Sequence, residues 1–210
     1  MVARRWIALA GLALITLAAP TIAKEEAEPK HLALGNKAPM SDIEMVGVDG
    51  KKITIAKAAG KKGTLVIFTC NSCPWVKAWE ERTVELGNGF AKQGVGVIAI
   101  NSNDSNLKEE DNLEGMKARV KARGVKYAYV VDQTSEVARA FGATRTPEVF
   151  LFDAKGALVY HGAIDDNAQK EDQVKERYLE NALEAVVAGK KVKVQETKAL
   201  GCTIKFRKEA

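Results

Sequence analysis

The sequence predicts an α/β sandwich, in which helices pack against a central sheet. Unbroken apolar runs, such as residues 64–69 and 95–100, alternate along the chain with segments whose apolar residues recur every three or four positions. The chain then closes with a hairpin and a final helix, and this alternation is typical of a sheet covered by helices. With 210 residues, of which 46% are hydrophobic, the chain is suited to one folded domain. A disordered or fibrous protein is excluded.

In the first half of the chain, a hairpin and a buried strand lead into a helix. Residues 43–48 and 52–55 flank Asp49-Gly50, which is a strong hairpin turn signal. Residues 64–69 are continuously apolar, as expected for a strand covered on both faces. The following segment predicts a helix, which Gly87-Asn88-Gly89 is expected to break or kink. The apolar face of this helix is formed by Val76, Trp79, Thr83 and Leu86.

The second half of the chain continues to alternate between strands and helices. Its turns are marked by glycine and by short polar residues, which also cap helices. The predicted elements are a strand at 95–100, a helix at 113–123, a strand at 127–131, a helix from the cap Thr134 to Phe141 closed by Gly142, a hairpin of 149–152 and 158–161 across 153–156, and a last helix at 171–188 stopped by Gly189.

Residues 1–23 have the pattern of a secretory signal. Two arginines precede an uncharged run that is short for a bilayer span, and the run ends in small residues. We expect cleavage after Ala23, with Ala19 as the alternative site and an uncleaved anchor as the alternative interpretation. The mature chain is then periplasmic or secreted, without a stable membrane span. The predicted organisation is a signal peptide at 1–23, a lead-in at 24–34, a domain at 35–189 and a C-terminal extension at 190–210 that docks on the domain.

The charge of the chain does not indicate a nucleic-acid partner. The formal net charge is +5, but 32 basic residues stand against 27 acidic ones. The basic residues are scattered in pairs such as Lys51-Lys52 and Lys61-Lys62. Such a distribution is typical of a solvated surface, so we expect no nucleic-acid binding.

Cys70-Asn71-Ser72-Cys73 lies where the buried strand passes into a helix. Two cysteines at this spacing can close a disulfide, and the free N–H groups of a helix start stabilise a thiolate, which we assign to Cys70. Pro74 suits the first helical turn, which needs no N–H from it. Two other interpretations remain: a zinc site, for which only Cys202, His31 and His161 offer further ligands, and a pair of inert buried thiols. An exported chain favours redox chemistry.

Residues 60–165 resemble the thioredoxin superfamily, with a strand, a CxxC motif, a helix, a strand and then Thr146-Pro147 before a hairpin. Longer strings resemble its peroxiredoxin-like thioredoxin group, which has a redoxin or thiol-specific antioxidant type domain. These strings are Gly35-Asn-Lys-Ala-Pro39, Cys70-Asn-Ser-Cys-Pro-Trp-Val-Lys77, Ile100-Asn-Ser-Asn-Asp104, Thr146-Pro-Glu-Val-Phe-Leu-Phe-Asp153, Tyr160-His-Gly-Ala-Ile-Asp-Asp166 and Gly201-Cys-Thr-Ile-Lys205.

The resemblance implies a thioredoxin-like fold: a central mixed sheet with helices on both faces, an N-terminal β-hairpin and an inserted strand-helix unit. The strand before Cys70 is then central, between the strands at 95–100 and 149–152. The resemblance also implies that Pro147 is cis and packs against a Cys70–Cys73 disulfide.

The implied activity is exchange or reduction of disulfides in envelope proteins or small molecules. Cys70 is the nucleophile and Cys73 the resolving thiol, and the direction of electron flow is open. No organic cofactor and no metal is expected, but a redox partner must recycle the pair. Further candidates are Pro74, Thr146, Pro147 and Glu148 as active-site support, with Glu148 also a candidate for proton exchange with Cys73, and Trp75, Asn103 and Asp104 as substrate contacts.

Two alternative functions remain open. A thiol peroxidase would use Cys70 against peroxide, but the peroxiredoxin motif P-x-x-x-T-x-x-C is not present, since Ile67 stands three residues before Cys70. The buried aspartate of thioredoxin corresponds to Thr64. A copper carrier would bind through the two cysteines and His161, although relatives of that kind space their cysteines differently.

Cys202 is the third cysteine and has three possible roles. Cys202, Ile204 and Phe206 alternate like the apolar face of a short strand, which favours burial of a free thiol. If the segment docks near Cys73, Cys202 acts as a third redox thiol that relays oxidation away from the active site. The remaining alternative is a disulfide-linked dimer.

Overall fold

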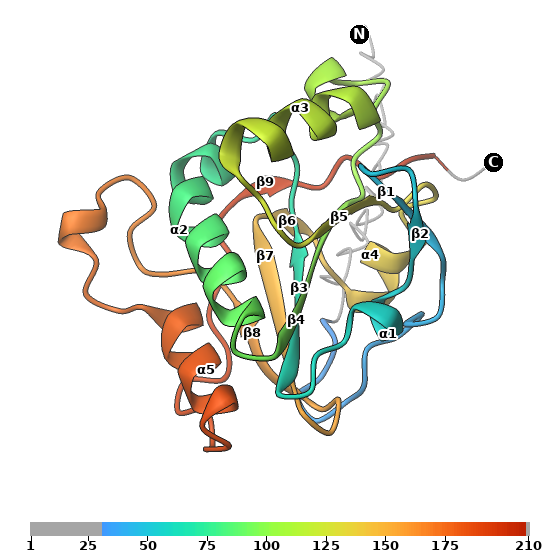
Figure 1. Cartoon of the computed structure of the whole chain (residues 1–210). Coiled ribbons are helices and arrows are strands. Elements are labelled where there is room, and N and C mark those ends of the chain that lie inside the picture. Colours follow the sequence, from blue (N-terminus) through green and yellow to red (C-terminus); the bar gives the residue numbers. More distant parts are fainter. Residues whose placement is uncertain (1–30, 209–210) are drawn as a thin grey trace, which may run out of the picture.

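A seven-stranded mixed sheet runs through the middle of the molecule in the computed structural model, which describes residues 31–208 (Figure 1). The strand order is β2-β1-β5-β4-β3-β7-β8. β3 is parallel to β4 and antiparallel to β7, so the strand that leads to Cys70 is central, as predicted. The strands of this sheet are β1 Met45–Gly47, β2 Lys52–Ile53, β3 Gly63–Phe68, β4 Val95–Asn101, β5 Ala128–Val131, β7 Glu148–Asp153 and β8 Leu158–Gly162.

Helices cover both faces of this sheet, which confirms the predicted thioredoxin-like class. On one face, α2, α3 and α5 contribute Trp79, Met116 and Leu183 to a buried apolar core. On the other face, α1 and α4 contribute Ile55 and Phe141 to a second core. The helices are α1 Ile55–Ala58, α2 Pro74–Ala91, α3 Leu113–Arg123, α4 Glu136–Phe141 and α5 Tyr178–Val187, with 3₁₀ turns at Glu109–Asp111 and Glu171–Gln173.

The N-terminal hairpin forms at the predicted turn but with shorter strands. Gly50 has a φ of +78°, which favours glycine, and the N–H of Gly47 donates to the carbonyl of Lys51 at 2.8 Å. β1 also pairs antiparallel with β5, so the hairpin extends the central sheet. The short helix before Gly142 begins at Glu136 after Ser135, one residue later than the expected cap Thr134 implies.

Gly87-Asn88-Gly89 were predicted to break or kink the helix, and the predicted break is wrong, because α2 continues to Ala91. A Cβ on Gly87 would lie 2.4 Å from the ring of Tyr127, so glycine is needed there for close packing. The amide of Asn88 donates to the carbonyl of Gly124 and accepts from the N–H of Lys126. Tertiary packing thus compensates for weak helix propensity.

The predicted start of the last helix is also wrong. Glu171–Gln173 form only a 3₁₀ turn, and α5 begins at Tyr178. The side chain of Asp166 accepts the N–H of Lys175 at 3.0 Å, and the N–H of Asp166 donates to the carbonyl of Glu176 at 3.2 Å. These bonds hold the intervening residues in a loop, so the helix can begin only after them.

The C-terminal segment returns along the domain. Gln195 and Thr197 exchange backbone hydrogen bonds with His161, at the edge of the sheet. The segment then forms β9 (Cys202–Thr203), which pairs antiparallel with β6 (Arg145–Thr146) in a second, two-stranded sheet beside the main one (Figure 1).

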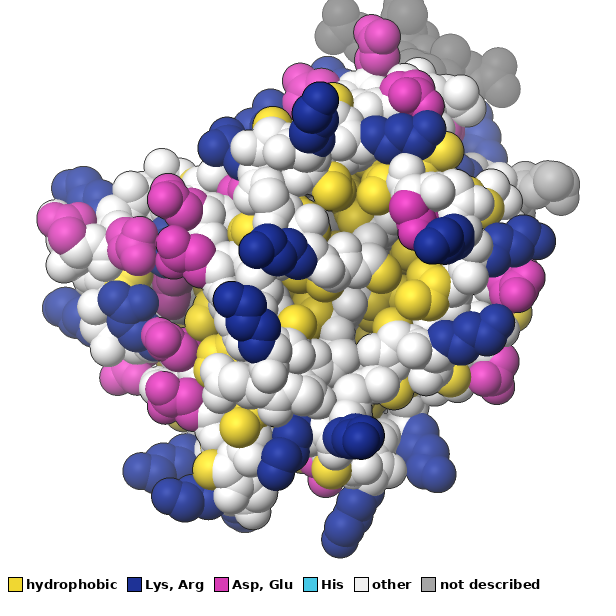
Figure 2. Space-filling model, viewed as in Figure 1, with side chains coloured by type: hydrophobic (Ala, Val, Ile, Leu, Met, Phe, Trp, Pro, Cys, Tyr) yellow, Lys and Arg dark blue, Asp and Glu magenta, His cyan; other side chains and the backbone are white. Residues whose placement is uncertain are grey.

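The expected signal peptide lies outside the described residues. Within 31–208, no helix has both the length and the apolar character that crossing a bilayer requires. Lys and Arg side chains are interspersed with acidic ones over the face shown in Figure 2.

Candidate active site

Three cysteines meet at one end of the central sheet. Cys70 follows β3, and Cys73 directly precedes α2. Cys202 comes from β9, and its sulfur lies 2.7 Å from that of Cys73. All three thiols are free, and Cys70 and Cys73 are each only 2% exposed. The predicted pair therefore lies beside the third cysteine.

The Thr146-Pro147 peptide is cis, as the resemblance implied, and it borders the cysteine pair. The hydroxyl of Thr146 is 3.4 Å from the sulfur of Cys70. The sulfur of Cys73 lies 3.1 Å from the carbonyl oxygen of Thr146. The loop before β7 thus contacts both members of the pair.

Cys70 and Cys73 differ in their ionisation. A hydrogen bond from Cys70, assisted by those from Cys202 and from the backbone N–H of Val76, lowers the pKa of Cys73 to about 4 against the opposing effect of burial. The hydrogen bond with Cys73, burial and the charge of Asp111 raise the pKa of Cys70. The sequence-based prediction placed the thiolate on Cys70; in this reduced form the N–H of Val76 at the helix start donates to Cys73 and favours its ionisation.

Asp111 holds the turn between the two cysteines and was not predicted. Its carboxylate is buried and accepts the N–H groups of Asn71 and Ser72 at 2.7 and 3.0 Å. It also accepts the hydroxyl of Ser72 at 2.7 Å and the amide of Asn103 at 3.0 Å. In the sequence Asp111 ends a charged run, 108–111, that is typical of a solvated loop. The one available signal was that the N–H groups of the CxxC turn need an acceptor.

A small cavity of about 50 Å³ lies beside Cys70 and is lined in part by Pro147, Tyr127 and Tyr129. Burial raises the pKa of Tyr129, so its hydroxyl stays neutral and donates to the side-chain oxygen of Asn71 at 3.1 Å. Ile67, at the position where peroxiredoxins carry threonine, is buried in β3, and its side chain offers no hydrogen-bonding group.

Comparisons with known proteins agree with this geometry. The family model described as Redoxin matches residues 33–182. The chain belongs to the Redoxin family. This result confirms the resemblance to the peroxiredoxin-like group of the thioredoxin superfamily.

Two solved structures are similar to this Redoxin protein over most of its length. A hypothetical protein from Sinorhizobium meliloti is 35% identical with a TM-score of 0.78, covering 85% of this chain and 97% of that one. An uncharacterized protein from Geobacillus kaustophilus is 33% identical with a TM-score of 0.79, covering 85% and 94%. A curated relative from Bacillus cereus, named thiol-disulfide oxidoreductase ResA, is 24% identical over 72% of this chain and 79% of its own.

The predicted substrate contacts of the Redoxin protein differ in exposure. Trp75 is 37% exposed beside the cysteine pair, whereas Trp79 is buried, as predicted. Asn103 is buried, and its side chain donates to Asp111 and accepts the N–H of Lys205. The carboxylate of Asp104 caps the N–H of Asn106. Asn103 therefore reaches the CxxC turn through Asp111, and Asp104 stabilises its own loop.

Glu148 is fully buried and supports residues 144–147, called here the cis-proline loop because they end in the cis Thr146-Pro147 peptide. One carboxylate oxygen accepts the N–H groups of Thr144 and Arg145 at 2.8 and 2.9 Å. The other lies 2.7 Å from Nε2 of His161 and 3.4 Å from Nδ1 of His31. These bonds use both oxygens to position the loop.

The same three side chains, His31, Glu148 and His161, are also grouped as metal ligands would be. Each offers one possible ligand atom, and these three atoms all lie within 4.8 Å of one another. Within the described part of the chain, this is the one group of three or more such residues. The copper set considered above required His161 together with the two cysteines. His161 instead bonds Glu148.

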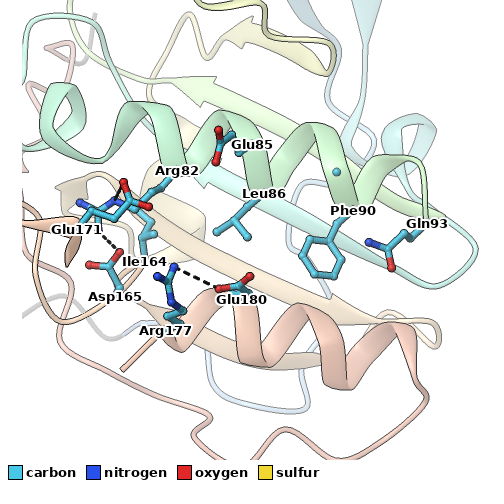
Figure 3. A pocket seen from close by; sticks show the side chains of 11 residues that line it. Arg82, Glu85, Leu86, Phe90, Gln93, Ile164, Asp165, Glu171, Arg177 and Glu180 are labelled. Carbon is cyan, nitrogen blue, oxygen red and sulfur yellow. Dashed lines mark hydrogen bonds and ion pairs between the residues drawn. The ribbon is translucent and has the colours of Figure 1, made fainter. Parts of the chain in front are cut away.

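A larger hollow, of about 260 Å³, lies between α2 and α5 (Figure 3). None of the three cysteines lines it. Two ion pairs lie in it, Arg82 with Asp165 and Arg177 with Glu180. These pairs indicate a structural role.

Proposed function

We propose that this Redoxin protein is an exported thiol–disulfide oxidoreductase that works through Cys70 and Cys73. The oxidoreductase class follows from the family and from relatives named thiol-disulfide oxidoreductase. The assignment to these residues is supported by one observation above all: two buried cysteines, spaced as CxxC at the start of α2, both contact Thr146 of the cis Thr146-Pro147 peptide.

The ionisation of the pair supports a specific order of steps. Cys73 carries the negative charge in the reduced protein, and it takes the proton of Cys70 as Cys70 attacks a sulfur of the substrate disulfide. One substrate sulfur leaves as a thiolate, and the other stays bonded to Cys70. Cys73 gives that proton to the substrate thiolate that has just left, helped by the donors that remain from Cys202 and Val76, and then attacks the sulfur of Cys70. The second substrate thiol leaves, and the Cys70–Cys73 disulfide remains.

The proposed location rests on residues 1–23, and the proposed partners rest on the redox chemistry of the cysteine pair. The signal-like residues 1–23 support export to the periplasm or beyond, where substrate disulfides persist. The pair carries the electrons itself, so a recycling partner must exchange disulfides with it. CxxC potentials in this fold run from about −270 to −120 mV, so the pair can act in either direction until its potential is measured.

Insulin reduction in the presence of dithiothreitol tests the proposal. Cys70→Ser should abolish turnover, because it removes the thiol that attacks the substrate disulfide. Cys73→Ser should accumulate a mixed disulfide between Cys70 and an insulin chain, which added reductant releases. Full activity of Cys70→Ser would refute the proposal.

Trp75 is proposed to form part of the docking surface for protein disulfides, since its exposed ring lies next to the pair. Trp75→Ala should raise KM for insulin several-fold while leaving the reduction of a small disulfide unchanged. Ile43→Ala, which removes another exposed apolar side chain, is the matched control. Equal KM values in the two variants would remove Trp75 from the proposal.

A further inference from the structure

The contact between Cys73 and Cys202 has no part in the two-cysteine reaction above. Their sulfurs are 2.7 Å apart, in a small cluster with Cys70 and Val76. Cys202 is partly exposed, whereas Cys70 and Cys73 are buried. A third thiol thus lies between the buried pair and solvent.

Pairing of β9 with β6 fixes the position of Cys202. Cys202 lies opposite Thr146 in the antiparallel register, so the strand that carries it runs along the cis-proline loop. The preceding Gly201 packs against that loop, where a Cβ would lie 2.3 Å from the carbonyl oxygen of Thr146. Only glycine permits this approach, so Gly201 brings the Cys202 sulfur within contact of Cys73.

The residues after Cys202 fix the segment from the other side. Ile204 is buried in the core beneath α4, and its N–H donates to the carbonyl of Thr144 at 2.9 Å. The N–H of Lys205 donates to the side chain of Asn103 at 2.8 Å. Cys202 is therefore placed between two anchored ends rather than on a free tail.

We propose that Cys202 is a third redox thiol, which exchanges with the Cys70–Cys73 disulfide to give a Cys73–Cys202 disulfide. The thiolate of Cys202 attacks the sulfur of Cys73, a Cys73–Cys202 bond forms, and Cys70 leaves as a thiolate. One disulfide and one thiol are present before and after the step, so no external oxidant is consumed. This inference rests on the proposed function and extends it.

Ionisation supports the order of these events. Burial, a hydrogen bond with Cys73 and the charge of Cys73 raise the pKa of Cys202 to about 11, so it stays protonated while the pair is reduced. Once Cys73 is in a disulfide, its charge is gone. The N–H of Trp75 and the charge of Lys205, which lower the pKa of Cys202, then act with less opposition. Cys202 thus ionises more readily when the pair is oxidised than when it is reduced.

The exchange has two consequences for the cycle. It frees Cys70 in the oxidised protein, and it moves the disulfide to the more exposed cysteine. A recycling partner then attacks the sulfur of Cys202, which is easier to reach than the sulfurs of the buried pair.

Disulfide mapping tests this proposal. The full chain is oxidised with diamide, remaining thiols are alkylated at acid pH, and the monomer is isolated on a non-reducing gel. Trypsin yields residues 63–77, which contain Cys70 and Cys73, and residues 199–205, which contain Cys202. We expect some wild-type molecules to join the two peptides through Cys73, with Cys70 alkylated.

Two variants make the result decisive. In Cys70→Ser the joined peptides should account for most of the oxidised monomer, because Cys73 has no other partner in contact. In Cys73→Ser, the matched control, Cys202 should be alkylated. The proposal is overturned if Cys202 stays alkylated in both the wild type and Cys70→Ser, or joins Cys73 only in dimers. Failure of insulin reduction with joined peptides present would count against the proposed function alone.

Discussion

Asp165, which packs against α2, and Asp111, which packs against the turn before α2, are two buried carboxylates whose oxygens are satisfied in different ways. Asp165 forms an ion pair with Arg82 and also accepts the indole N–H of Trp79 at 2.7 Å. Asp111 accepts its four hydrogen bonds from neutral amide and hydroxyl groups of Asn71, Ser72 and Asn103. Both are almost fully buried, at 3% and 1% exposure.

The difference shows how one protein separates stability from chemistry. A buried ion pair cancels its own field, so Asp165 joins α2 to the loop after β8 with little effect at a distance. Neutral donors satisfy Asp111 but leave its negative charge in place. That charge contributes to the raised pKa of Cys70 and so helps to keep the proton of the pair on that sulfur.

The largest loss of stability is expected when Arg82, the cation that pairs with Asp165, is replaced. Arg82→Met should lower the free energy of unfolding by about 3–5 kcal/mol, because it leaves Asp165 buried without its partner. The ionisation of the cysteines should not change. Urea unfolding measures the first quantity, and thiolate absorbance the second. Arg177→Met, at a partly exposed pair in the same hollow, should cost about 0–1 kcal/mol. Equal losses in the two variants would contradict the comparison.

The second prediction concerns the pH dependence of stability, which is expected from the cysteines and not from the Arg82–Asp165 ion pair. The folded pKa of Cys73, about 4, lies below its ordinary value of 9.0, so the folded state binds fewer protons between these values. Stability of the reduced protein should therefore rise as the pH is raised from about 4 to 9. Above that range the raised pKa of Cys70 reverses the trend. Urea midpoints of reduced and oxidised protein should diverge over this range, and parallel curves would contradict the assignment.

The smallest effect is expected at Asp111. Asp111→Asn removes the charge and one of two acceptor oxygens, which should cost about 1–3 kcal/mol and lower the pKa of Cys70. The titration of thiolate absorbance measures the shift. Asp104→Asn, at a carboxylate that caps its own loop, should leave that pKa unchanged. An unchanged pKa in Asp111→Asn would show that the carboxylate acts only as a hydrogen-bond acceptor.

The fold was largely predictable because apolar periodicity determines the strands and helices. The central position of β3 and the hairpin around Gly50 followed from such patterns and from the family resemblance. The continuity of α2 through Gly87 did not, because it depends on the ring of Tyr127, which comes from a distant part of the chain.

The site was predictable where it rests on local motifs and not where it rests on long-range contacts. The CxxC pair and Thr146-Pro147 are visible in the sequence. Asp111 is not, since a charged run gives no sign that its last carboxylate is buried under the CxxC turn. The pairing of β6 with β9 is also hidden, because two residues per strand are too few to show a period.

The separation of Cys202 from Cys73, 129 residues along the chain, also sets an order in time. A ribosome adds about 5–20 residues per second, so Cys202 is made on the order of ten seconds after Cys73. During that interval the two cysteines of the motif have only each other as partners. Synthesis from one end thus makes both cysteines of the motif before the strand that brings the third sulfur beside them.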